Sequence, residues 1–275
     1  MAISLSESID APVVLTGRGG SGTRMLSQLA AKIGIFVGNQ TNKSGDSTEW
    51  VPLIYRLAVE TGGARDLPTG SRYRAAIREQ GGKILRAAPA RSASLWGLKL
   101  PETMLVLPLL VDAFPQAKIV HLTRHPVSSS LRRTHMTSRL NNPVGAVALP
   151  AAYRYAQRDL TLISSDEPHL HNAYSWNFQV RRVMHYARET LPGWQYLVVA
   201  YEDMCREPAR VATAVCAFLG CADDADAAVP VDASRSGEWD PADPRAETIW
   251  RICGETAALL GYARSSAFRT PSGGA

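Results

Sequence analysis

The sequence is poor in residues that bind metals or form cross-links. No histidine cluster has the spacing of a zinc site, and none of the four cysteines forms a C-x-x-C pair: Cys205, Cys216, Cys221 and Cys253. We therefore expect free thiols in a reducing compartment, and no metal site.

Long apolar runs are also lacking. The longest, at 104–111, contains Pro108 and falls well short of the roughly 18 residues that a membrane helix needs. The first ten residues carry Glu7 and Asp10 and no basic segment, which is not typical of a secretory signal. These features predict a cytoplasmic protein without a membrane span.

Acidic residues are outnumbered by basic ones, 25 to 30, giving a net charge of +5. The basic residues are spread along the chain, which favours a discrete site for an anionic ligand over a nucleic-acid-binding tail. Hydrophobic residues make up 45% of the 275 positions, as in proteins that form a core. We predict a single domain, 1–275, with its core at about 11–262 and a disordered tail at 263–275.

Strand-like segments alternate with helical ones along the chain. The expected strands are 11–16, 96–100, 117–123 and 194–200. The expected helices are 23–34, 50–60, 73–80, 103–114, 126–139, 176–190, 208–219 and 247–260, and the stretch 140–172 is expected to be mixed and to include a mobile segment. This alternation predicts an α/β fold, with a P-loop-like parallel sheet flanked by helices on both faces.

A glycine-rich segment, G-R-G-G-S-G-T-R at 17–24, joins the first expected strand to the first expected helix. In this position, backbone N–H groups and a helix N-terminus point at one place, which is typical of an anion site. A tight turn without a ligand is the alternative. Arg18, Ser21, Thr23 and Arg24 lie within the segment and favour anion binding.

Two common nucleotide-binding patterns fit this loop incompletely. Gly17, Gly19 and Gly22 satisfy G-x-G-x-x-G, but no acidic residue follows about 20 positions later, so an NAD(P) enzyme is disfavoured. A Walker A loop needs Lys followed by Ser or Thr where this chain has T-R at 23–24. A P-loop kinase or NTPase remains an alternative function, although this loop lacks the lysine that such proteins use.

The S-G-T element between a strand and a helix resembles the phosphosulfate loop of sulfotransferases that use PAPS (3′-phosphoadenosine 5′-phosphosulfate), including the bacterial enzymes that act on small molecules. That loop reads roughly K-S-G-T-T in cytosolic members and R-K-G-G-T-R in heparan sulfate 3-O-sulfotransferases. Gly20 replaces a basic residue of the family, with Arg18, Arg24 and Lys99 as candidate substitutes. The resemblance implies a donor site that also includes these loop residues: Gly19, Gly20, Ser21, Gly22 and Thr23.

Further segments carry the same resemblance. K-I-V-H-L-T-R-H-P at 118–126 is similar to the family's strand and 3′-phosphate motif, which implies that Arg124 binds that phosphate. The family has a serine eight positions later, where this chain has Arg132, and Ser128, Ser129 and Ser130 are nearby substitutes. Y-E-D-M, beginning at Tyr201, resembles the element whose tyrosine lies beside adenine. R-S-G, formed by Arg235, Ser236 and Gly237, resembles the R-K-G element over the 3′-phosphate.

The catalytic residues are less clear from the sequence. Lys99 follows the pattern of the family's K-T-H segment, but Pro101 replaces its histidine base. The heparan-type enzymes use a glutamate 20–30 residues after the loop, which makes Asp46 and Glu49 the candidate bases. Each carboxylate is equally compatible with capping the following helix. The lesser candidates are Glu102 and His121.

The leading hypothesis is transfer of a sulfuryl group from PAPS to a hydroxyl or amine of a small molecule, leaving PAP (adenosine 3′,5′-bisphosphate), without a metal. A non-catalytic module that binds the bisphosphate is a further alternative, because Gly20 and Pro101 replace residues that carry chemistry in the family. Segments 61–95 and 134–172 are expected to form the acceptor pocket and its lid. Their aromatic and histidine residues suggest an aromatic or amphipathic acceptor: Tyr73, His135, Tyr153, Tyr155, His169 and His171.

Overall fold

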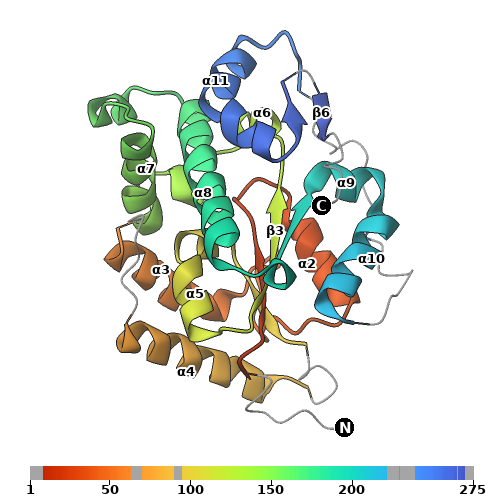
Figure 1. The fold of residues 1–275 in the computed structure, drawn as a ribbon. Coiled ribbons are helices and arrows are strands. Elements are labelled where there is room, and N and C mark those ends of the chain that lie inside the picture. The colour runs from red at the N-terminus through yellow and green to blue at the C-terminus, as the bar shows by residue number, and fades with distance from the viewer. Residues whose placement is uncertain are drawn as a thin grey trace.

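The computed structural model describes residues 9–62, 70–89, 95–221, 229, 239–264 and 266–269. Four strands form one parallel sheet in the order β2-β1-β3-β4. They are β1 (Val13–Thr16), β2 (Gly97–Lys99), β3 (Lys118–Thr123) and β4 (Tyr196–Ala200). Because parallel neighbours need crossover connections, helices run between these strands (Figure 1). The predicted α/β fold with a parallel sheet is confirmed.

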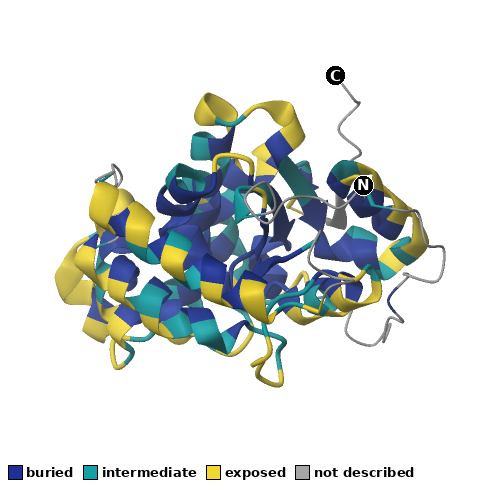
Figure 2. Cartoon of the chain, turned by 90° about the horizontal axis from the view of Figure 1, so that it is seen from below, coloured by how far each residue is buried: buried dark blue, intermediate teal, exposed yellow. Residues whose placement is uncertain are grey.

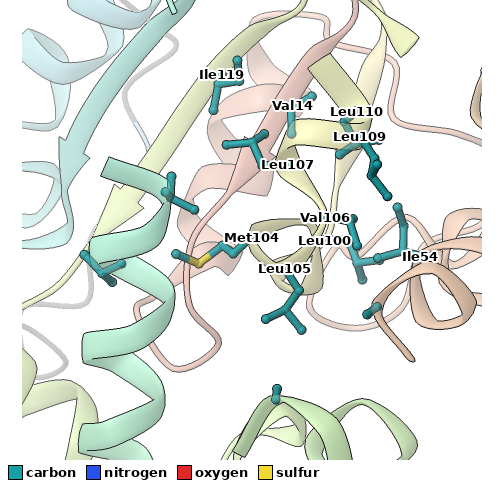
Figure 3. Close-up of a cluster of buried hydrophobic side chains, with 14 of the residues drawn as sticks. Val14, Ile54, Leu100, Met104, Leu105, Val106, Leu107, Leu109, Leu110 and Ile119 are labelled. Atoms are coloured by element: carbon teal, nitrogen blue, oxygen red, sulfur yellow. The ribbon is translucent and has the colours of Figure 1, made fainter. Parts of the chain in front are cut away.

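Helices cover both faces of the sheet, because successive strand residues point to opposite sides. Val14 and Ile119 belong to one core, part of which is drawn in Figure 3. The main helices of that core are α3 (Val51–Glu60), α4 (Ser71–Ala87), α5 (Leu107–Ala113), α8 (Pro168–Thr190) and α11 (Pro244–Leu259). Leu15 and Val120 belong to the second core, whose helices are α2 (Thr23–Lys32), α9 (Tyr201–Arg206) and α10 (Pro208–Leu219).

The carboxyl ends of the four strands lie along one edge of the sheet. Their register aligns Leu15 with Lys99 and Thr123 with Ala200. The residues that follow the strands therefore meet at this edge, where open α/β sheets bind ligands. These residues begin the glycine loop after β1, the Pro101 turn after β2, the Arg124 turn after β3 and helix α9 after β4.

The stretch 140–172, expected to be mixed, contains helix α7 (Pro143–Tyr155) and the first turn of α8. The Asn142 side chain accepts hydrogen bonds from the backbone N–H groups of Val144 and Gly145 and so caps α7. The proline inside the helix, Pro150, does not end it.

Two further segments differ from expectation. The helix expected at 126–139 ends early, as α6 (Pro126–Ser130), and the chain then turns to a short 3₁₀ helix, η4 (Met136–Ser138). The expected tail carries a small antiparallel pair, β5 (Tyr262–Ala263) and β6 (Ser266–Arg269).

Burial follows this layered arrangement. In Figure 2 the strands at the centre are buried, and the exposed residues lie along the outer faces of the helices. Among the described residues, no helix is both long enough and apolar enough to cross a membrane.

Candidate active site

The glycine loop adopts a backbone that most side chains would disrupt. Gly20 and Gly22 have φ angles of 94° and 90°, which favour glycine. Helix α2 begins directly after the loop, at Thr23, and carries no acidic residue in its first turn. Among the described residues, the buried hydroxyls of Ser21, Ser129 and Ser130 have no hydrogen-bond partner. The loop contributes one of these unused hydroxyls and a helix N-terminus, and α6 contributes the other two hydroxyls, which together fit an anionic group.

Gly22 is held against Tyr201, the first residue of α9. A Cβ atom at Gly22 would lie 2.2 Å from the Tyr201 ring. The Tyr201 ring in turn lies under the guanidinium of Arg124, with the Cζ atom 4.1 Å from the ring centroid. The glycine loop, the start of α9 and the Arg124 turn, which are far apart in sequence, thus pack against one another.

Replacing Gly22 with alanine is expected to lower the free energy of unfolding by about 2–4 kcal/mol. About 1 kcal/mol of this comes from the positive φ angle, and the rest from overpacking against Tyr201. Gly34 is the matched control, because its φ is 82° and a Cβ atom added there would meet no other atom within 4 Å. In urea unfolding, Gly34→Ala should lose only the backbone part, and equal losses in the two variants would contradict the close contact.

The predicted 3′-phosphate residues come together at the end of β3. Arg124 is buried, and its Nε donates to the Ser128 hydroxyl over 3.0 Å. Burial lowers the pKa of Arg124, and the positive charge of Arg132 lowers it further. The structure thus groups Arg124, Ser128, Arg132 and Tyr201. The predicted partners Arg235, Ser236 and Gly237 lie outside the described residues.

His125, next to Arg124, joins this group to the carboxy-terminal part of the chain. Its ring stacks on Trp239 with centroids 4.1 Å apart, and on Trp250 at 5.6 Å. The backbone N–H of His125 donates to the Glu202 carboxylate, which also accepts the Tyr262 hydroxyl. These contacts hold helix α11 and β5 beside the Arg124 turn. Glu202 has a structural role there, because it links His125 to Tyr262.

Arg18 points into the protein interior. It is fully buried, and its guanidinium donates to the Ser138 hydroxyl at 2.7 Å and to the Asn172 side-chain oxygen at 2.6 Å. Burial lowers its pKa to about 10. Arg18 therefore ties the glycine loop to α8, whereas Arg24 is exposed and its charge acts on Lys99.

Lys99, at the end of β2, forms a buried ion pair with Asp46, with 2.5 Å between Nζ and Oδ1. Its Nζ also donates to the Ser44 carbonyl oxygen. The pKa of Lys99 is lowered by burial, against the opposing effect of Asp46. Asp46, predicted as base or cap, caps no helix and is the counterion of Lys99. The Glu49 carboxylate lies outside this ion pair and accepts a hydrogen bond from the backbone N–H of Gln40.

Glu102, a lesser candidate in the sequence, lies beside this ion pair. It is the second residue of the turn after β2, and only 3% of it is exposed. The Tyr55 hydroxyl donates to its carboxylate over 3.4 Å, and the Nε2 atom of His135 is 3.9 Å away. Burial raises the pKa of Glu102 to about 7. A buried carboxylate with this pKa beside a lysine is suited to accept a proton near neutral pH.

The other histidine candidate and most of the predicted aromatic pocket lie away from this site. His121 is buried in β3, where its Nδ1 pairs with the Tyr196 hydroxyl. Tyr153 is a buried residue of α7, and its hydroxyl donates to the Asp166 carboxylate. Of the predicted pocket residues, His135 contacts the glycine loop, at Gly19. A separate cavity of about 1280 Å³ lies between α8, β4 and α10 and is lined by no residue of the glycine loop.

Among the described residues, no group of three or more His, Cys, Asp or Glu side chains could hold a metal ion. The four cysteines, all of which lie in the described part of the chain, are free.

Comparison with known proteins bears on the fold and the family of the chain. No curated protein sequence matches the chain. The fold is similar to the sulfotransferase domain from the curacin biosynthetic pathway, with a TM-score of 0.53 and 13% identity over 92% of this chain and 98% of that one. It is also similar to a sulfotransferase from Alicyclobacillus acidocaldarius, with a TM-score of 0.53 and 14% identity over 93% of this chain and 98% of that one. The model of the sulfotransferase family matches residues 12–225, and the chain belongs to this family.

Proposed function

We propose that the protein transfers a sulfuryl group from PAPS to the hydroxyl of a small-molecule acceptor, with Glu102 as general base. The observation that carries the proposal is the buried Glu102 carboxylate beside Lys99, at the ligand-binding edge of the sheet, with its pKa raised to about 7. This arrangement supports proton removal from an acceptor at neutral pH.

The chain offers two groups of residues to hold the donor. The glycine loop and the Ser21 hydroxyl would bind the 5′-phosphosulfate, and Arg124 with Ser128 and Arg132 would bind the 3′-phosphate. When bound, PAPS supplies the electrophilic sulfuryl group and a phosphate leaving group. Family membership and the unpartnered buried hydroxyls support this fit.

Lys99 and Asp46 would have different roles in this mechanism, Lys99 in stabilising charge and Asp46 in positioning Lys99. The Lys99 ammonium would stabilise negative charge that develops on the transferred group and the leaving phosphate. Asp46 holds Lys99 in place and opposes the loss of its charge on burial. Because Asp46 is engaged in this ion pair, Glu102 is the better candidate for the base.

The surface beside the site supports an amphipathic acceptor. Met136 is 41% exposed and Leu140 is 48% exposed, and both lie on the segment that follows His135. Arg133, just before His135, and Arg139, on the segment after it, act electrostatically on His135. An acceptor with an apolar body and a polar or acidic group would match this combination of exposed apolar and basic side chains.

Arg124→Ala is expected to weaken binding of PAP about 10- to 100-fold, because a charge-assisted hydrogen bond to phosphate is lost. Isothermal titration calorimetry of the purified protein, with and without Mg²⁺, measures this directly. Arg86→Ala, which removes an exposed arginine from α4, is the control and should leave the affinity unchanged.

ATP and NADPH serve as comparison ligands in the same titration. Metal-independent binding of PAP in preference to both is the expected result. Binding of ATP with Mg²⁺ and no binding of PAP would overturn the proposed donor in favour of a kinase-like function.

A further inference from the structure

His135 lies between the glycine loop and Glu102. A Cβ atom at Gly19 would lie 1.9 Å from Cδ2 and 2.0 Å from Nε2 of His135, so the ring packs directly on the loop backbone. The same Nε2 atom is 3.9 Å from Oε1 of Glu102. One imidazole nitrogen thus faces both the donor loop and the proposed base.

The contacts of Nδ1 favour one tautomer of the His135 ring: besides the backbone N–H of Thr137, the Thr137 hydroxyl lies 3.4 Å from Nδ1 and can donate to it. His135 precedes η4, and its Nδ1 accepts the backbone N–H of Thr137 over 3.5 Å. An Nδ1 that accepts a hydrogen bond leaves the proton of a neutral imidazole on Nε2. The Nε2–H group therefore points toward Glu102.

The charges around His135 keep it neutral. Burial and four basic side chains lower the pKa of His135 to about 3: Arg18, Lys99, Arg139 and Arg133. Glu102 faces the ring from the turn after β2, and its own pKa is raised to about 7. Between pH 5 and 9, His135 is therefore expected to be a hydrogen-bond donor and unable to act as a base.

We infer that His135 Nε2–H and the Glu102 carboxylate together hold the acceptor's hydroxyl oxygen, and that the enzyme therefore sulfates hydroxyls in preference to amines. The inference rests on the proposed function. An oxygen about 2.8 Å from both atoms would bridge their separation at an angle of about 90°, which suits an oxygen that donates one hydrogen bond and accepts another.

The preference follows from the lone pairs of the acceptor atom. A hydroxyl oxygen has two lone pairs, so one accepts the His135 N–H while the other attacks sulfur. In the balanced step the new O–S bond forms, the S–O bond to the phosphate breaks with its electron pair remaining on the phosphate oxygen, and the hydroxyl proton passes to Glu102. A neutral amine has a single lone pair, and a hydrogen bond from His135 would occupy the pair needed for attack.

The tautomer is tested by NMR of protein labelled with ¹⁵N-histidine, using His135→Gln to assign the signals. The expected result is a neutral imidazole with its proton on Nε2 throughout pH 5 to 9. A proton on Nδ1, or protonation of His135 near pH 7, would overturn the inference. This measurement does not depend on turnover of any acceptor.

The selectivity is tested with 2-naphthol and 2-naphthylamine, two probes that differ only in the acceptor atom. The wild-type protein is expected to prefer the naphthol, and His135→Ala should lower kcat/KM for the naphthol about 10-fold and reduce the naphthol-to-naphthylamine ratio. His135→Gln retains an N–H donor and should recover part of the loss. A wild-type preference for the amine, or an unchanged ratio in His135→Ala, would contradict the inference.

Calorimetry with PAP separates the two proposals. Unchanged PAP binding in His135→Ala shows that the donor loop survives the substitution. Failure of the wild-type protein to bind PAP would overturn the proposed donor. Normal PAP binding with the Nδ1 tautomer would overturn only the role of His135.

Discussion

Glu102→Gln is expected to reduce kcat about 10²- to 10⁴-fold, the contribution typical of a positioned general base. Glutamine has nearly the same shape and keeps an oxygen for the Tyr55 hydroxyl, so the substitution removes the proton acceptor with little change in packing. Steady-state kinetics with PAPS and a responsive acceptor measures the effect. Glu49→Gln is the matched control, because the Glu49 carboxylate contacts the turn at Gln40 and should leave kcat unchanged.

The pH dependence of the rate tests whether Glu102 is the base. Glu102 must be ionised to accept a proton, and burial raises its pKa to about 7. The rate of the wild-type protein should therefore fall about tenfold per pH unit below pH 7 and level off above it. In Glu102→Gln the remaining activity should lose this dependence. An unchanged acid limb in the variant would assign the base to another group.

Above pH 7, Glu102→Gln should stabilise the folded protein although it lowers kcat. A carboxyl group whose pKa is higher in the folded protein stabilises the fold at low pH, and this contribution is lost as the pH rises through about 7. Above that pH, Glu102 is a buried charge in the wild-type protein, whereas glutamine is neutral. Thermal unfolding of Glu102→Gln should therefore show a gain in Tm at pH 8 and little change at pH 5.

Lys99→Met is expected to reduce kcat about 10²- to 10³-fold, which is the usual cost of removing one group that stabilises charge in the transition state. Methionine fills much of the volume of the lysine stem but carries no charge. Because the substitution leaves Asp46 without its ion-pair partner, the Asp46→Asn/Lys99→Met double variant is needed as a structural control. The double variant should regain stability and stay inactive.

Calorimetry distinguishes the roles that Lys99 could have. If Lys99 acts mainly in the transition state, PAP should bind Lys99→Met with nearly normal affinity while kcat falls. A loss of PAP affinity as large as the loss of kcat would instead make Lys99 a donor-binding residue.

The sheet and several helices could be predicted from sequence because local signals agreed there. Helix α10 occupies the predicted 208–219, since Pro208 opens it and Gly220, with a φ of 76°, follows it. Helix α7 could not be predicted, because Pro150 and Gly145 argue locally against a helix, while its capping and burial depend on its neighbours. Tertiary packing of this kind is not visible in a single segment.

The candidate site shows the same division between local and distant determinants. The glycine loop, Arg124 and Tyr201 follow strands, so their meeting at one edge could be predicted from the parallel order. The importance of Glu102 arises from Tyr55 and His135, which are far from it in sequence. The inward orientation of the Arg18 side chain likewise depends on Ser138 and Asn172, which are distant in sequence. From the sequence alone, an arginine in a glycine loop indicates an anion ligand instead.

The stack of His125 on two tryptophans has a practical consequence for handling the protein. Trp239, Trp250 and Tyr262 lie far beyond Arg124 in the sequence and pack on its neighbour His125, so the half of the site nearest Arg124 is completed only after these residues have been synthesised. Shortening the carboxy-terminal end past Tyr262 would damage this half first.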